Sequence, residues 1–229
     1  DLHSFPTRRS SDLEPETIGL LLIAGSIGVF VPFAVLTMIF EYPDILRQDT
    51  GTILAKFHSG GSSLILIWWA FAILGLPLLI AYILIGQKFE NKLGFIKGVT
   101  TFGVISGIVQ IIALLRWVFV VPVIANNYIS ASDVATKKAA VLSFQTIHQF
   151  GGALLGEHIG QLFTIIWSVM MSYAFIKLNI FSKWISWFGI IASGIYLVAQ
   201  AELFATVIPG VPVRSEEHTS ELQSQNRIS

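Results

Sequence analysis

Only a few side chains of this 229-residue protein combine chemical reactivity with a position inside a long apolar segment. Ionisable groups in such segments are costly to place in a bilayer, and they commonly mark ligand, ion or proton sites. Gln161 follows Glu157 by four residues, so both side chains point to one face of an α-helix. The sequence therefore predicts a ligand-binding polar cluster that consists of Arg116, His148, Glu157, His158, Gln161 and Glu202.

Other interpretations of these residues stay open. Arg116 could extend to the outer surface along its aliphatic stem, or it could pair with Glu157 or Glu202 only to hold helices together. We expect it within charge-pair reach of one of these two glutamates. His148, Glu157 and His158 are also of types that bind metal or haem iron. However, adjacent helical residues point about 100° apart, and a His-Glu-x-x-His pattern is missing. We therefore predict no metal, no cofactor and no catalytic residue.

The composition is typical of a membrane protein. Hydrophobic residues make up 54% of the chain and charged residues 12%, whereas charged residues usually contribute about 25%. The mean hydropathy is +0.73. The absence of cysteine excludes disulfides and thiolate chemistry, and a formal net charge of zero without a basic stripe argues against a nucleic-acid partner. The fold class that follows is all-α, a polytopic helix bundle in a lipid bilayer.

Five segments are long enough to cross a bilayer, which takes about 20 apolar residues. They cover residues 17–40, 64–86, 99–123, 153–176 and 184–206. A further helix is expected before the fourth segment, since Ser132 or Asp133 can cap its start and Gly151 with Gly152 can stop it. This helix lies in the membrane interface or is an ordinary solvated helix, and its sequence fits both.

Small residues predict where two of these helices pack. Gly152, Gly156 and Gly160 recur every four residues, and Gly103 and Gly107 have the same spacing in residues 99–123. Such spacing lets the backbones of two membrane helices approach closely. We therefore predict that the third and fourth membrane helices contact each other through these glycines.

Lysine placement predicts the orientation in the membrane. The short links carry Lys88, Lys92, Lys97, Lys177 and Lys183. Because lysine is enriched on the cytoplasmic side, the short links are expected in the cytoplasm. The polar cluster then faces outward, and Trp117 is expected in an outer aromatic belt.

The two ends of the chain differ in character from the rest. Residues 1–13, DLHSFPTRRSSDL, and residues 214–229, RSEEHTSELQSQNRIS, are polar although apolar segments adjoin them. Both read as translations of the adapters used to prepare sequencing libraries. We therefore predict non-native tails at 1–13 and 214–229 and one membrane helical domain over residues 14–213. The native domain is expected to continue into one more span.

A resemblance adds to these observations. The stretch from His148 through GEHIGQLFTIIWSVMMSYAFIK to KWISWFGIIASGIYL resembles a family of bacterial multi-pass membrane proteins known as a domain of unknown function. The resemblance implies a bacterial integral membrane protein, usually with six spans, and we expect it in the cytoplasmic membrane. It transfers no reaction, ligand or catalytic residue.

Three functions remain open. The first is binding or transport of a small ligand through the outward-facing polar cluster. The second is an accessory or structural role in which the polar groups only hold helices together. The third is a membrane oxidoreductase with a cofactor bound by histidine. No pattern typical of an enzyme occurs in the sequence, so a non-enzymatic role is favoured.

Overall fold

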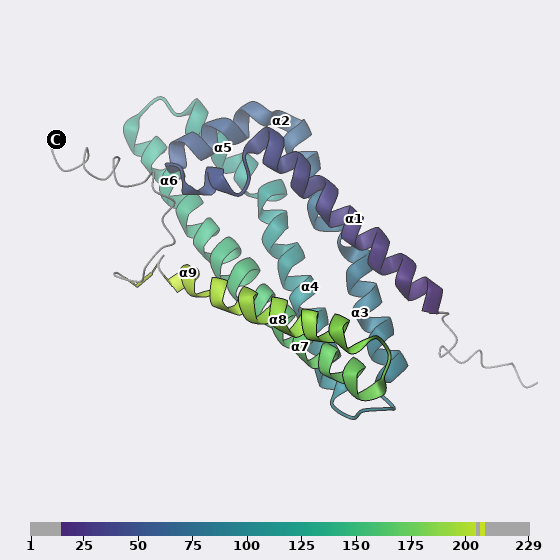
Figure 1. Ribbon diagram of the computed structural model, residues 1–229. Helices are drawn as coiled ribbons and strands as arrows, with labels where there is room; N and C mark the ends of the chain where they lie inside the picture. The colour runs from purple at the N-terminus through teal and green to yellow at the C-terminus, as the bar shows by residue number, and fades with distance from the viewer. Residues whose placement is uncertain (1–14, 205–206, 209–229) are drawn as a thin grey trace, which may run out of the picture.

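All regular secondary structure in the described residues is helical. The computed structural model describes residues 15–204 and 207–208 (Figure 1). The predicted all-α fold class is therefore confirmed, whereas the two predicted tails lie outside the described residues. The elements in chain order are α1 (Pro15–Phe40), η2 (Asp44–Arg47), α2 (Thr50–Ile73), α3 (Leu76–Phe89), α4 (Ile96–Phe119), α5 (Val121–Ser130), α6 (Val134–Ile147), η3 (His148–Gly160), α7 (Gln161–Leu178), α8 (Lys183–Ala199) and α9 (Ala201–Phe204).

Four helical stretches are long and apolar enough to cross a bilayer. They are Pro15–Phe40, Thr50–Phe89, Ile96–Ser130 and Val134–Leu178. The predicted fifth span corresponds to Lys183–Ala199, a shorter apolar helix of 17 residues. The predicted count of five is thus approximate, but the protein is a membrane protein.

Prolines divide two of these stretches. Pro77 falls near the middle of the predicted segment 64–86, but it lies in the first turn of α3, after a break at Leu74 and Gly75. Pro122 lies in the same position of α5. Proline lacks a backbone N–H, which the first helical turn does not need. Each proline therefore begins a new helix rather than bending an existing one.

The helix before the fourth predicted span begins as expected but does not end as expected. The Asp133 carboxylate accepts a hydrogen bond from the Thr136 N–H at 2.8 Å and caps α6. The predicted stop at Gly151 and Gly152 is wrong, because the helix continues through η3 into α7. These glycines instead pack closely, since a Cβ on Gly152 would lie 2.7 Å from Nη2 of Arg116.

Helix α4 lies at the centre of the bundle and contacts α2, α3, α5, η3 and α7 (Figure 1). Its buried residues include Val99, Gly103, Ser106, Ala113 and Trp117, which follow one another at helical spacing. Because α4 contacts the other elements along this buried face, it positions their polar residues.

An aromatic core surrounds the C-terminal half of α4. The rings of Trp68 and Trp117 stack with their centroids 4.7 Å apart, and Phe40 contacts both rings edge-on. Trp117 is fully buried, so its predicted place in an outer aromatic belt is wrong. The reason is that α1, α2 and α6 cover the face of α4 that carries this ring.

Candidate functional site

A cavity of about 260 Å³ brings together three of the predicted ligand-binding residues. Arg116 comes from α4, Glu157 from η3 and Gln161 from the first turn of α7. The cavity is also lined by residues of α1, the following turn, α2 and α8. These further lining residues include Phe33, Tyr42, Phe71, Gln110, Gly152, Gly156 and Tyr196. We call this space the polar cavity.

Arg116 is the only strongly basic side chain among the residues that line the polar cavity. It is 9% exposed, and its Nη1 donates to the backbone oxygens of Ala113 and, at 3.4 Å, of Gly151. Its Nε is buried without a hydrogen-bond partner among the described residues. The guanidinium therefore points inward, against η3, rather than out to the membrane surface.

The expected direct pair between Arg116 and Glu157 is not formed. In the described part of the chain, the direct ion pairs join Arg47 to Asp44 and Lys56 to Glu41. Arg116 and Glu157 interact electrostatically without an ion-pair contact. Instead of pairing with Glu157, Nη1 of Arg116 donates to backbone oxygens of α4 and η3. The side chain of Glu202 lies outside the described residues.

Two tyrosines complete the surroundings of Glu157. Tyr42 and Tyr196 both line the polar cavity and interact electrostatically with the carboxyl group. Burial raises the pKa of the Tyr42 hydroxyl above its ordinary value of 10.0, and Glu157 acts in the same direction. The Tyr42 phenol is therefore protonated at neutral pH and can donate a hydrogen bond.

The segment that carries Glu157 is a π-helix over its whole length, His148–Gly160. Hydrogen bonds from residue i to i+5 widen the turn, and such segments are rare and frequent at functional sites. The α-helical spacing assumed from the sequence is therefore wrong for this segment. Glu157 and Gln161 still face one cavity, but they do so across the junction between η3 and α7.

The glycines of η3 place its backbone against α4. A Cβ on Gly156 would lie 2.9 Å from Cβ of Ala113, and one on Gly160 would lie 2.7 Å from Cγ of Gln110. The other predicted packing residues have different partners. Gly103 faces Trp167 of α7, and Gly107 faces Leu79 of α3. Gly103 therefore faces α7, which lies within the predicted fourth segment 153–176, whereas Gly107 accommodates α3.

A network of hydrogen-bonded polar side chains also connects α4 to η3 and α7. Ser106 Oγ donates to the Gly160 backbone oxygen at 2.8 Å and lies 2.6 Å from Oγ1 of Thr164. Gln110 Nε2 donates to Thr164 Oγ1 at 3.0 Å. We call these three side chains the Ser106 network. Because Gln110 also lines the polar cavity, the network supports one wall of it.

The two histidines lie outside the lining of the polar cavity. His148 stacks on Phe144 with ring centroids 5.4 Å apart, and its buried Nδ1 has no partner among the described residues. His158 contacts Phe204 edge-on at 5.7 Å. Among the described residues, no group of three or more His, Cys, Asp or Glu side chains could hold a metal ion.

The sequence interpretation missed Tyr42, Gln110 and Tyr196 as cavity residues. Gln110 carried a usable signal, because it and Ser106 are polar, four residues apart, in the otherwise apolar stretch of residues 102–115. The tyrosines carried none, since tyrosine is common at membrane interfaces without any ligand.

Comparison with known proteins then places the chain. Residues 17–217 match the family described as "Domain of unknown function (DUF4386)". The chain belongs to this family. The predicted resemblance to a family of unknown function is thus confirmed, and the match covers most of the predicted domain over residues 14–213. No curated protein and no solved structure matches the chain. The family description names no activity, so the function has to be argued from the polar cavity.

Proposed function

We propose that this membrane protein binds a small polar ligand with an anionic group in the polar cavity. One observation carries the proposal: Arg116 is buried beside this space, and its Nε lacks a partner among the described residues. A buried charge without a close counter-ion is strongly unfavourable. An anionic group of a ligand would complete the hydrogen bonds of the guanidinium and balance its charge.

Glu157 gives the ligand a second requirement. It lines the same cavity with a charge opposite to that of Arg116, so a purely anionic ligand would be repelled at that end. A zwitterion satisfies both residues, with its anionic group at Arg116 and its cationic group at Glu157. Tyr42, Tyr196 and Gln110 add hydrogen-bonding groups. The volume of about 260 Å³ is just below the range of about 300–1,000 Å³ for drug-sized ligands, which favours a small molecule.

The accessory role has a specific observation in its favour. Arg116 and the Ser106 network both bond to backbone oxygens of η3, as helix-stabilising groups would. If the role is accessory, replacement of Arg116 changes the stability of the protein, but the parent protein itself shows no response to a ligand. Nothing comparable favours the oxidoreductase, because His148 and His158 lie against different aromatic rings.

Thermal unfolding of the purified protein in mild detergent tests the proposal. The probes are inorganic phosphate, glycine and glycerophosphoethanolamine, which differ in size and in whether they carry an ammonium group. A bound ligand at 100 times its Kd stabilises a protein by about 2.7 kcal/mol. We expect at least one zwitterionic probe to raise the unfolding temperature of the parent protein.

The variants decide where the probe binds. Arg116→Gln should abolish the response and Glu157→Gln should weaken it, whereas Lys56→Gln is the matched control because Lys56 pairs with Glu41 outside the cavity. Absence of a response to all three probes in the parent overturns the binding proposal and leaves the accessory role. Transport requires a separate flux measurement with the probe that binds.

We also propose a bacterial cytoplasmic membrane with the short links inside. Lys88, Lys92, Lys97, Lys177 and Lys183 are all exposed. Ring contacts between Phe89 and Phe175 and between Phe95 and Tyr173 bring the two lysine-bearing links to one end of the bundle. This clustering supports the orientation by the positive-inside rule.

Cysteine labelling tests this orientation, because the chain contains no cysteine of its own. Lys92→Cys and Ser132→Cys lie at opposite ends of the stretch Ile96–Ser130. In intact cells, a membrane-impermeant maleimide should label the Ser132→Cys protein and leave the Lys92→Cys protein unlabelled until the cells are opened. The reverse pattern overturns the orientation.

A further inference from the structure

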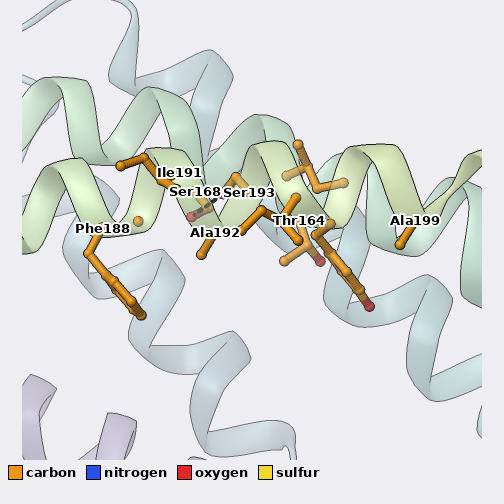
Figure 2. Close-up of a pocket in the computed structure, with 11 residues that line it drawn as sticks. Thr164, Ser168, Phe188, Ile191, Ala192, Ser193 and Ala199 are labelled. Carbon is orange, nitrogen blue, oxygen red and sulfur yellow. Dashed lines mark hydrogen bonds between the residues drawn. The ribbon is translucent and has the colours of Figure 1, made fainter.

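An open groove of about 560 Å³ between α7 and α8 adjoins the polar cavity. Figure 2 shows residues that line this groove, which we call the α8 groove; Thr164 and Ser168 come from α7, and Phe188, Ile191 and Ala192 come from α8. Tyr196 lines both spaces. The spaces are also neighbours along α7, where Gln161 of the polar cavity comes one turn before Thr164 of the groove.

The α8 groove offers a ligand almost no polar partner. The hydroxyls of Ser168 and Ser193 hydrogen-bond to each other at 3.0 Å, and Thr164 belongs to the Ser106 network. The remaining wall is made of aliphatic and aromatic side chains. Phe188 and Ile195 are both 69% exposed, so the groove opens sideways, towards the lipid. Its chemistry suits a hydrocarbon chain.

The depth of the two spaces in the membrane is consistent with this occupant. Helical rise places Arg116 about 30 Å from Ile96, the first residue of α4, a distance equal to the hydrocarbon thickness of about 30 Å. With Ile96 at the inner surface of the membrane, as the proposed orientation requires, the polar cavity lies near the outer headgroups. From Tyr196 to Phe188 the groove follows α8 for about 12 Å, nearly the depth of one leaflet. It leads away from the polar cavity along α8 towards Phe188.

We propose that the ligand is a bilayer lipid with a zwitterionic headgroup, held with its phosphodiester at Arg116, its ammonium group at Glu157 and one hydrocarbon chain in the α8 groove. The proposal rests on the proposed ligand-binding function and names the class of ligand. It explains why an apolar groove adjoins a polar cavity that is too small for most ligands. Cavity and groove together have the volume that small-molecule sites usually provide.

Three probes separate the headgroup from the chain. Native mass spectrometry of the purified protein in mild detergent measures binding of lysophosphatidylethanolamine, of lysophosphatidylglycerol with the same acyl chain, and of glycerophosphoethanolamine. We expect lysophosphatidylethanolamine to bind at least ten-fold more tightly than glycerophosphoethanolamine, because only the former has a chain. It should also bind more tightly than lysophosphatidylglycerol, which has no ammonium group for Glu157.

A groove-filling variant locates the chain. Ala192 lines the groove, so Ala192→Phe should weaken lysophosphatidylethanolamine binding about ten-fold and leave glycerophosphoethanolamine binding unchanged. Ala24→Phe is the matched control, because Ala24 is an exposed residue of α1. Equal binding of lysophosphatidylethanolamine and glycerophosphoethanolamine by the parent protein overturns the lipid proposal without requiring any variant.

The remaining outcomes distinguish the two proposals. If glycerophosphoethanolamine binds in an Arg116-dependent way but the chain adds no affinity, the lipid proposal fails and the proposed function stands. If neither lysophosphatidylethanolamine nor glycerophosphoethanolamine binds, the lipid proposal fails, and the proposed function fails with it only if inorganic phosphate and glycine also leave the unfolding temperature unchanged. If Ala192→Phe changes the oligomeric mass of the protein but not its lipid binding, the groove holds a protein helix, and the lipid proposal is again overturned.

Discussion

Replacement of Gly103 by alanine should strain the contact between α4 and α7. A Cβ at this position would lie 2.5 Å from Cδ1 and 2.8 Å from Nε1 of Trp167. The indole also contacts Tyr82 of α3, with ring centroids 4.0 Å apart, which restricts its movement. The added methyl group must therefore displace a ring that is already held between two helices.

The size of the effect follows from two opposing contributions. Alanine is favoured over glycine in a helix by about 1 kcal/mol. Overfilling a packed interior costs about 1–3 kcal/mol. Gly98 provides the matched control, since it lies in the same helix and a Cβ there has nothing within 4 Å. Gly98→Ala gains the helix preference alone, so Gly103→Ala should be less stable than Gly98→Ala by about 1–3 kcal/mol.

Unfolding by titration of a denaturing detergent into mild-detergent micelles measures this difference. Comparing the two variants with each other removes the helix-preference contribution and leaves the steric one. Equal unfolding free energies of Gly103→Ala and Gly98→Ala would refute the reasoning. In that event Trp167 relaxes freely, and the close approach of α4 to α7 does not depend on glycine.

Three further predictions concern the helix caps, the polar network and the ends of the chain. Hydrogen bonds from Thr52 to the carboxylate hold the pKa of Asp49 below its ordinary 3.8, so Asp49→Ala should cost about 0.5–2 kcal/mol at neutral pH. The ionised carboxylate is the stabilising form, so the difference in unfolding free energy between the parent protein and Asp49→Ala should shrink as the pH falls below 3.8. If this difference stays unchanged in acid, the capping role is contradicted. Ser106→Ala should cost about 1–2 kcal/mol, since interhelical hydrogen bonds in membranes average about 0.6 and reach about 1.7 kcal/mol each, and the exposed Ser26→Ala on α1 should cost nothing measurable. Removal of residues 1–13 and 214–229 should leave the unfolding temperature unchanged, and a clear decrease would show that these segments belong to the fold.

Composition and segment length predicted the helical fold because they express a strong physical demand. Every backbone polar group in a bilayer must be satisfied within the protein, which leaves helices as the simplest solution for apolar segments of this length. The cap at Asp133 was also predictable, since it depends on neighbouring residues alone. The end of that helix was not, because whether Gly151 and Gly152 stop a helix depends on Arg116, which is distant in sequence.

The same distinction applies to the polar cavity. Arg116, Glu157 and Gln161 could be selected because polar side chains are rare in membrane helices and need partners. The π-helix changes which side chains of η3 share a face, and no local sequence pattern predicted it. The environments of His148 and Trp117 depend on the aromatic core, which forms only when α1, α2, α4 and α6 come together. Such burial is a property of packing, and the order of residues does not reveal it.

The stacked Trp68 and Trp117 rings provide the protein with a built-in optical reporter. Their planes are 10° apart, a geometry in which the electronic transitions of two indoles couple. The Arg116 guanidinium lies 5.4 Å from the centre of the Trp117 ring and also borders the polar cavity. A ligand that draws the guanidinium away from this ring alters the field at the coupled pair. Near-ultraviolet circular dichroism can therefore follow occupancy of the cavity in the unlabelled protein.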